Sequence, residues 1–256
     1  MQKQLLFEFP LNERIRAFLR LELLFRQARH FAAEPAPWCS RAALDTLHQI
    51  LELLGRADLK TELIKEMERH TATLEGLRDK KGVDGARLEA ILSELDRLQD
   101  HLHANAQGFC TELRNNEFLN AVRNRSAIPG GTSSFDLPGY HHWLQQPPAR
   151  RNEDLAYWLH EVEPLNESLV LVLRLLRESA LPRQVVAEGG LYHHTMDEAP
   201  WRLLRIYLPP DSPLFPEVSG GKHRFTIRFL TATTAGDKPK AVKSDVTFAL
   251  AGCGFY

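Results

Sequence analysis

Hydrophobic residues recur every three or four positions over most of the first 180 residues of the chain, which is the period of an amphipathic helix. Asn12 precedes the first such stretch and is typical of a helix-capping residue. This helix is predicted to run to about His30. Ser40 is predicted to cap a second helix, and Gly55 is typical of the position where a helix ends.

Amphipathic stretches continue beyond this second helix. Asp58 is predicted to cap a third helix, whose solvent side is expected to carry Glu66 and Arg69, and Asp84 is predicted to begin a fourth. Long amphipathic helices joined by short loops are typical of a helical bundle. We therefore expect the apolar stripes of these helices to form a core, although a stripe of this kind also suits contact with a second copy.

A segment at residues 123–144 interrupts the helical pattern. Arg123 and Arg125 close the incoming helix, where the helix dipole favours cations, and Pro129 with two following glycines stops it. Several large apolar residues follow, so we expect the segment to fold back onto the core: Phe135, Leu137, Tyr140 and Trp143. With its hydroxyls, histidines and arginines, it is predicted to form a polar and structured surface.

The period changes from 3.6 to 2 after Pro182, as it does in β-strands. Alternation around Ile206, Ile227 and Phe248 predicts three strands separated by glycine- and proline-rich turns. A short alternating stretch, residues 5–9, is expected to join the same sheet. The pattern predicts an α+β fold, with a helical bundle domain at residues 11–181 and an antiparallel sheet or small sandwich at residues 1–10 and 182–256.

Composition bears on the cellular compartment but does not indicate a function. The 256 residues carry a formal net charge of -1, so any electrostatic role must come from local clustering of charge. Three widely spaced cysteines do not form a disulfide framework, which favours a reducing cytoplasm. The first residues show no signal-peptide pattern, and the longest apolar run is far too short to span a membrane.

Catalytic and metal sites find little support in the sequence. No G-x-S-x-G nucleophile elbow is present, and a triad of Ser133, Asp136 and His141 would need geometry that residues so close in sequence rarely adopt. The glycines before Ser133 lack the lysine of a phosphate-binding loop. The adjacent histidine pairs point apart in regular structure, so we expect no metal site and no cofactor.

Arginines crowd the first helix. Arg16 and Arg20 lie four positions apart and share one face, where like charges repel unless solvent or an anionic partner offsets them. A basic stripe of this kind suits nucleic acid, with a steep dependence on salt, and it equally suits an acidic peptide through bidentate contacts with carboxylates. Both alternatives remain open at this point, although no nucleic-acid-binding motif is present.

Three stretches resemble the ZapD family, the Z-ring-associated cell-division proteins of proteobacteria. Residues 6–22 resemble the opening of the family, and residues 122–144 resemble its central signature. Residues 214–229 resemble its late strands and the turn between them. The resemblance covers nearly the whole chain, whereas residues 32–108 support it mainly through their helical pattern.

The resemblance implies a symmetric homodimer, without enzymatic activity, that acts in the cytoplasm at the division site. Such a protein would bind the C-terminal tail of the tubulin-like GTPase FtsZ and cross-link its filaments, with no membrane or nucleic-acid partner. The expected tail-binding residues are Arg16, Arg20, Arg123, Arg125 and His141. Phe135 or Tyr140 is expected to add apolar contact. The alternative function is a nucleic-acid-binding module that uses the same arginines.

Overall fold

The computed structural model describes residues 4–56, 59–104, 110–196, 201–221, 223–231 and 236–254. The chain divides into two compact units, one made of Met1–Arg16 with Leu173–Tyr256 and the other of Ala17–Val172. We describe each unit by itself. The predicted division into domains of residues 11–181 and of residues 1–10 with 182–256 stays a prediction.

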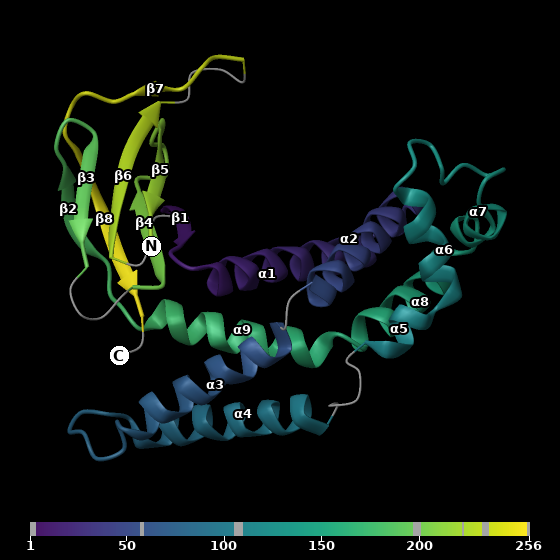
Figure 1. Cartoon of the computed structure of the whole chain (residues 1–256), viewed down its shortest axis with the longest axis horizontal. Coiled ribbons are helices and arrows are strands. Elements are labelled where there is room, and N and C mark those ends of the chain that lie inside the picture. The colour runs from purple at the N-terminus through teal and green to yellow at the C-terminus, as the bar shows by residue number, and fades with distance from the viewer. Residues whose placement is uncertain are drawn as a thin grey trace. The chain divides into compact units, whose positions relative to one another are not determined.

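The second unit is helical throughout its described residues (Figure 1). Two of its helices, α1 and α9, continue into the first unit. The helices are α1 (Glu13–Ala32), α2 (Pro37–Arg56), α3 (Leu59–Glu75), α4 (Gly85–Ala104), α5 (Thr111–Asn115), α6 (Glu117–Ser126), α7 (Pro138–Leu144), α8 (Pro148–His160) and α9 (Glu163–Glu178). Together with the sheets of the first unit, they confirm the predicted α+β class.

Capping explains where some of these helices begin. The side-chain oxygen of Asn12 accepts a hydrogen bond from the backbone of Ile15 at 2.8 Å, and Asp84 does the same for Arg87 at 3.1 Å, as predicted. The prediction for Ser40 was wrong, because α2 already begins at Pro37, a residue suited to a first helical turn. Asp58, the predicted cap of α3, lies outside the described residues.

Glu66 corrects a second expectation, because its side chain is fully buried and does not face solvent. It lies on the buried face of α3 together with Leu63, about one turn before it, and His70, about one turn after it. Its carboxylate accepts a hydrogen bond from Arg69 at 3.0 Å. A buried carboxylate needs such partners, and the charge of Arg69 helps to offset the cost of burying Glu66, whose other carboxylate oxygen lies 3.7 Å from Nε2 of His70.

A buried arginine joins three separate parts of the helical unit. The Arg151 side chain, on α8, is 2% exposed. It donates to the Ser40 hydroxyl of α2 at 3.0 Å and to the Leu144 carbonyl at 3.3 Å. It also donates to the carbonyls of Gln146 and Pro35. Neutral acceptors thus surround the guanidinium, and they offset the large cost of removing its charge from water.

Aromatic rings from α6, α7 and α8 pack together beside this arginine-centred network. Phe118 stacks on Trp158 with ring centres 5.7 Å apart, and Tyr140 stacks on Trp143 at 6.2 Å. The indole nitrogen of Trp143 donates to Asp154 at 2.9 Å, which satisfies its one polar group. The central segment therefore does fold back onto the core, and it does so as a short helix, α7, which the hydrophobic pattern did not predict.

The first unit contains two antiparallel sheets in its described residues. One has the strand order β1-β4-β8-β2, and the other has the order β3-β6-β5 with β7 paired to β6. The strands are β1 (Leu5–Pro10), β2 (Arg183–Ala187), β3 (Leu191–Thr195), β4 (Leu203–Leu208), β5 (Leu214–Gly220), β6 (Arg224–Thr231), β7 (Lys240–Ala241) and β8 (Val246–Cys253). The predicted membership of the N-terminal strand is confirmed, because Leu5 of β1 pairs with Leu208 of β4.

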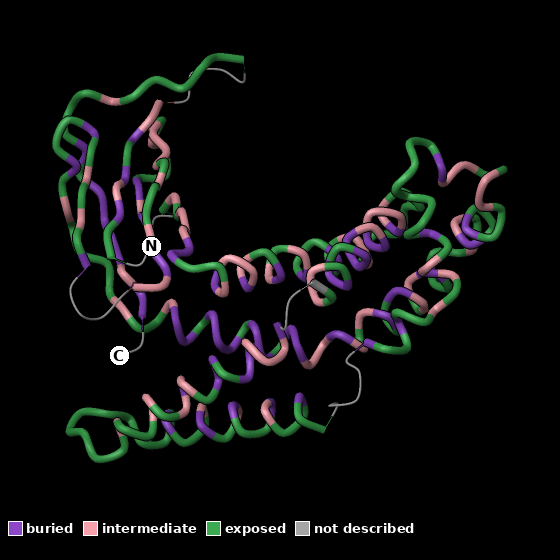
Figure 2. The backbone as a smooth tube through the Cα atoms, viewed as in Figure 1, coloured by how far each residue is buried: buried purple, intermediate pink, exposed green. Residues whose placement is uncertain are grey.

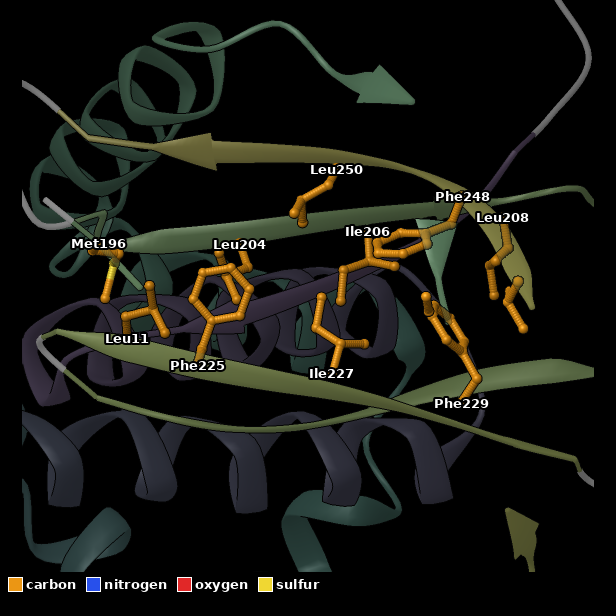
Figure 3. Close-up of a cluster of buried hydrophobic side chains, with 12 residues drawn as sticks. Leu11, Met196, Leu204, Ile206, Leu208, Phe225, Ile227, Phe229, Phe248 and Leu250 are labelled. Carbon is orange, nitrogen blue, oxygen red and sulfur yellow. The ribbon is translucent and has the colours of Figure 1, made fainter. Parts of the chain in front are cut away.

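Apolar side chains from the two sheets meet in one core (Figure 3). Alternate residues of β4 and β6 point into it, including Leu204, Ile206, Phe225 and Ile227. Along β6 and most of β4 the residues between them are more exposed, whereas Leu203 is buried as well, and Figure 2 shows the change of burial along the strands. This arrangement is what a period of two produces when one face of each sheet is buried.

A partly buried ion cluster joins the end of α9 to the first of these sheets. Glu8 of β1 accepts two hydrogen bonds from Arg177 of α9, at 2.9 and 2.7 Å. It accepts a third from Arg205 of β4 at 3.0 Å. One carboxylate thus binds two guanidinium groups, and all three side chains stay partly exposed to solvent.

We predict that Arg151→Met lowers the free energy of unfolding by about 3–5 kcal/mol, because it leaves buried carbonyl and hydroxyl groups without their donor. Urea denaturation of the full chain measures this loss. The matched control is Arg150→Ala, whose exposed side chain pairs with Glu153 at 3.4 Å and should change stability by about 1 kcal/mol or less. Equal effects of the two substitutions would contradict the role assigned to Arg151.

Candidate functional site

The five residues expected to bind an acidic tail fall in both units. Arg16 is the last residue of the N-terminal part of the first unit, and Arg20, Arg123, Arg125 and His141 belong to the second. A surface that includes all five therefore stays a prediction. The surroundings of each residue within its own unit show which of them is available to a partner.

Arg16 already has neighbours inside the first unit. Its Nε donates to the Glu13 carboxylate at 3.0 Å, and its guanidinium lies 5.7 Å from the centre of the Phe9 ring. Glu13 is strongly exposed, with 85% of its side-chain surface accessible, so this pair is a surface salt bridge of small energy. An anionic partner with better geometry would compete with it readily.

Arg20 lines a groove between α1 and α2. The groove has a volume of about 270 Å³ and is lined by Arg20, Leu23, Leu24, Gln49, Glu52 and Leu53. Arg20 forms no ion pair within the described part of the chain. The groove therefore combines an exposed cation with leucine side chains, which is a surface chemistry suited to a peptide that carries both acidic and apolar residues.

Arg123 lies on the exposed side of α6, close to α2. Its positive charge acts on His48 of α2, and it too forms no ion pair among the described residues. His48 immediately precedes Gln49, which lines the groove of Arg20. The middle of α2 is thus the element that both arginines border, so these two of the predicted residues have a common neighbour.

The electrostatics around His48 follow from its burial. Burial lowers the pKa of His48 from 6.5 to about 4; a hydrogen bond with the Leu119 backbone opposes this change, and the charge of Arg123 adds to it. The imidazole is consequently neutral at physiological pH and contributes no charge to the surface. Arg123 therefore carries the positive charge at this point of α2.

Arg125 lies in the last turn of α6, and its side chain faces the turn that follows the helix. Its Nη1 lies 4.0 Å from an Asp136 oxygen, and the Ser133 hydroxyl donates to the same carboxylate at 2.9 Å. Gly131 permits the tightness of this turn, since a Cβ there would lie 2.5 Å from the Arg125 carbonyl oxygen. The Ser133–Asp136 hydrogen bond is thus a local contact that stabilises the turn before α7.

His141 and the aromatic residues near it differ in exposure. His141 is exposed on α7, whereas Tyr140 is only 2% exposed and its burial raises the pKa of its phenol group. Of the two residues expected to add apolar contact, Tyr140 is covered within its own unit, because its ring is packed among Phe118 and Trp143. Phe135, the other residue of that pair, has 84% of its surface exposed and is available to a partner.

The leucines of the groove were missed by pattern analysis. As apolar residues of an amphipathic helix, Leu23 and Leu24 would be expected in the buried face of α1, but Leu23 is 46% exposed. The buried stripe instead follows Phe18, Leu21 and Phe25, with which a residue at position 23 is out of phase. That phase difference is the signal that would have identified Leu23 as a surface residue.

Other site types find no match in the described residues. No group of three or more histidine, cysteine or carboxylate side chains there is arranged to hold a metal ion. No described helix has both the length and the apolar content that crossing a membrane requires. Burial raises the pKa of the Cys110 thiol to about 12 and that of Cys253 to about 11, so neither is present as a reactive thiolate.

Comparison with known proteins agrees with the sequence resemblance. The family model described as "ZapD: Cell division protein" matches residues 19–228. A cell division protein ZapD of Methylococcus capsulatus is 42% identical over 254 residues, covering 99% of both chains. The chain belongs to the ZapD family. Proteins of the same name from Aromatoleum aromaticum and Azoarcus sp. are 40% and 38% identical, over 96% of this chain.

Membership of the ZapD family assigns the chain to cell division. The matched region contains Arg20, Arg123, Arg125 and His141, whereas Arg16 precedes its first residue. The identity with the Methylococcus ZapD extends over nearly the full length of both proteins, including the strands of the first unit. The family relationship therefore concerns both units and not the helical unit alone.

We predict that His48 makes stability depend on pH. Below 6.5 the unfolded chain binds a proton on this histidine, and the folded protein does not until about pH 4, so the free energy of unfolding falls as pH drops through this window. The loss from this group is on the order of 3 kcal/mol. Urea denaturation at pH 7, 5.5 and 4.5 measures it, with His48→Leu as the comparison.

His48→Leu removes the titrating group and keeps an apolar side chain in a buried position. Between pH 7 and 4.5 the free energy of unfolding of this variant should fall less than that of the unchanged protein. The comparison is of the two changes with pH, so the two proteins need not be equally stable at pH 7. Parallel pH dependences for the two proteins would refute the assignment.

Proposed function

We propose that this ZapD-family protein is a non-enzymatic adaptor that binds the acidic C-terminal tail of FtsZ and cross-links its filaments, so promoting assembly of the division ring. The observation that carries the proposal is the pair of exposed arginines, Arg20 and Arg123, that lie beside α2 without an ion-pair partner among the described residues. The protein would work in the cytoplasm at the division site and need no cofactor.

The chemistry of the surface suits an extended acidic peptide. A guanidinium group binds a carboxylate through two parallel hydrogen bonds, and each charge-assisted bond contributes about 1.5–3 kcal/mol. The exposed Leu23 in the groove of Arg20 offers apolar contact to a neighbouring side chain of the peptide. A few such contacts, after the cost of ordering the peptide, correspond to a Kd of about 1 μM.

Cross-linking requires two binding surfaces in one particle, so we propose that the protein acts as a homodimer. Two modest sites joined rigidly hold a pair of filaments far more firmly than either site holds one tail, because the second contact forms at a high effective concentration. Sedimentation equilibrium of the full chain tests the dimer directly. A monomer at the concentrations that bundle filaments would contradict this part of the proposal.

A nucleic-acid-binding module that uses the same arginines is the alternative function. The groove of Arg20 speaks against it, because Glu52 and three leucines line that groove and offer little to a phosphate backbone. Binding to a single strand or duplex with a steep salt dependence, together with no response to FtsZ, would favour the alternative.

We predict that Arg123→Ala and Arg20→Ala each weaken binding of a labelled FtsZ tail peptide by about tenfold or more, because each removes a charge-assisted contact. Fluorescence anisotropy measures the affinity. A peptide whose acidic residues are replaced by amides should bind the unchanged protein as weakly as the intact peptide binds these variants.

The matched control is Arg97→Ala on α4. Arg97 lies in the same unit and is exposed, but it pairs with Glu167 at 3.3 Å and belongs to no part of the proposed surface. It should leave tail binding and filament pelleting with GTP unchanged. If all three variants pelleted FtsZ filaments as well as the unchanged protein, the proposed surface would be wrong.

A further inference from the structure

The sheet β3-β6-β5 of the first unit carries a polar recess with a volume of about 800 Å³. The recess lies where β5 turns into β6 and extends across to β3. The residues of interest are His193 and Thr195 of β3, Ser219 of β5, and Arg224 and Thr226 of β6. None of them belongs to the surface proposed above for the FtsZ tail.

Strand register places these side chains on one face. Phe225 and Ile227 of β6 are buried in the core, so Arg224 and Thr226, which alternate with them, face outward. Thr226 pairs with His193 of β3 on one side and with Ser219 of β5 on the other. The outer face thus presents an imidazole and two hydroxyls in a row across three strands.

The adjacent row supplies the positive charge. Arg224 pairs with Thr195 across the strands and is exposed, and it forms no ion pair within the described residues. No aspartate or glutamate lines the recess among the described residues. A guanidinium group that has hydroxyl donors around it and no acidic neighbour to neutralise its charge favours the binding of an anion.

A hydrogen bond fixes the orientation of the imidazole. Nδ1 of His193 lies 2.9 Å from the Thr226 hydroxyl, which leaves Nε2 of the same ring available to a ligand. Histidine in this arrangement has one nitrogen committed to the protein and one free to bind, a common way of holding the ring in place.

We propose that this recess binds the phosphoryl group of a small-molecule phosphate ester. A phosphoryl group has three terminal oxygens that point in different directions, and so it accepts hydrogen bonds from donors spread over three strands, whereas a planar carboxylate accepts them in one plane. The recess is much larger than a phosphate ion, which leaves space for the esterified part of the ligand. The proposal does not depend on binding to FtsZ.

The test is calorimetric titration of the full chain with ribose 5-phosphate and with inorganic phosphate. Ribose and acetate serve as probes that lack the phosphoryl group. Binding of both phosphates, and of neither control probe, is the expected result. Equal affinity for acetate, or no binding of either phosphate, would overturn the proposal.

Two variants test the site itself. Arg224→Gln should weaken binding of ribose 5-phosphate by about tenfold to a hundredfold, because a charge-assisted contact is lost. Gly221→Asp should abolish binding by placing a carboxylate in the recess, and a Cβ at Gly221 meets no atom within 4 Å, so the fold tolerates it. Unchanged affinity in either variant would refute the assignment.

The matched control is Arg228→Gln. Arg228 lies on the same strand and is exposed, but it stands opposite Glu217 of β5 in the strand register and does not line the recess. It should bind ribose 5-phosphate as the unchanged protein does. A further arm uses vesicles that contain phosphatidic acid, since a lipid headgroup carries the same phosphoryl chemistry. Binding to the vesicles without binding to ribose 5-phosphate would overturn the small-molecule assignment.

Discussion

The guanidinium group of Arg151 is the constraint on which the helical unit depends. It lies inside the protein and is held by the Ser40 hydroxyl and by carbonyls from the α1–α2 loop and the turn before α8. Because its charge is tolerated only while these acceptors converge, the three segments must keep one arrangement. That arrangement fixes α2 and α7, and α2 is the helix that Arg20 and Arg123 border.

Much of the fold could be predicted because its elements have regular periods and local start signals. The Asn12 cap and the strand around Ile206 each depend on neighbours in sequence, and both predictions were confirmed. Ser40 and Glu66 were misplaced for the opposite reason. Ser40 accepts a hydrogen bond from Arg151, which lies 111 residues away in the chain. Glu66 has Arg69 within one helical turn, but its burial depends on which face of α3 packs against α4, and spacing alone does not reveal that face.

The candidate surface, too, could be predicted where it depends on residues close in sequence and could not be predicted where it depends on tertiary contacts. Charge and helical spacing identified Arg20 and Arg123 as exposed cations, since a guanidinium group on a helix rarely enters a core without partners. Spacing could not tell Tyr140 from Phe135. Their burial depends on α7, a helix of seven residues that packs Tyr140 against Phe118 and leaves Phe135 outside. The proximity of Arg123 to His48 depends on how α6 packs against α2, which is a tertiary contact.

The pairing of Leu5 with Leu208 has a consequence for how the chain is made. A ribosome adds about 5–20 residues per second, so roughly 10–40 s pass between synthesis of the first strand and of its partner. During that time β1 has no sheet to join, and every residue of the helical unit is synthesised before β4. The order of translation therefore favours helices that assemble first and a β-sandwich that closes last, around the oldest segment of the chain.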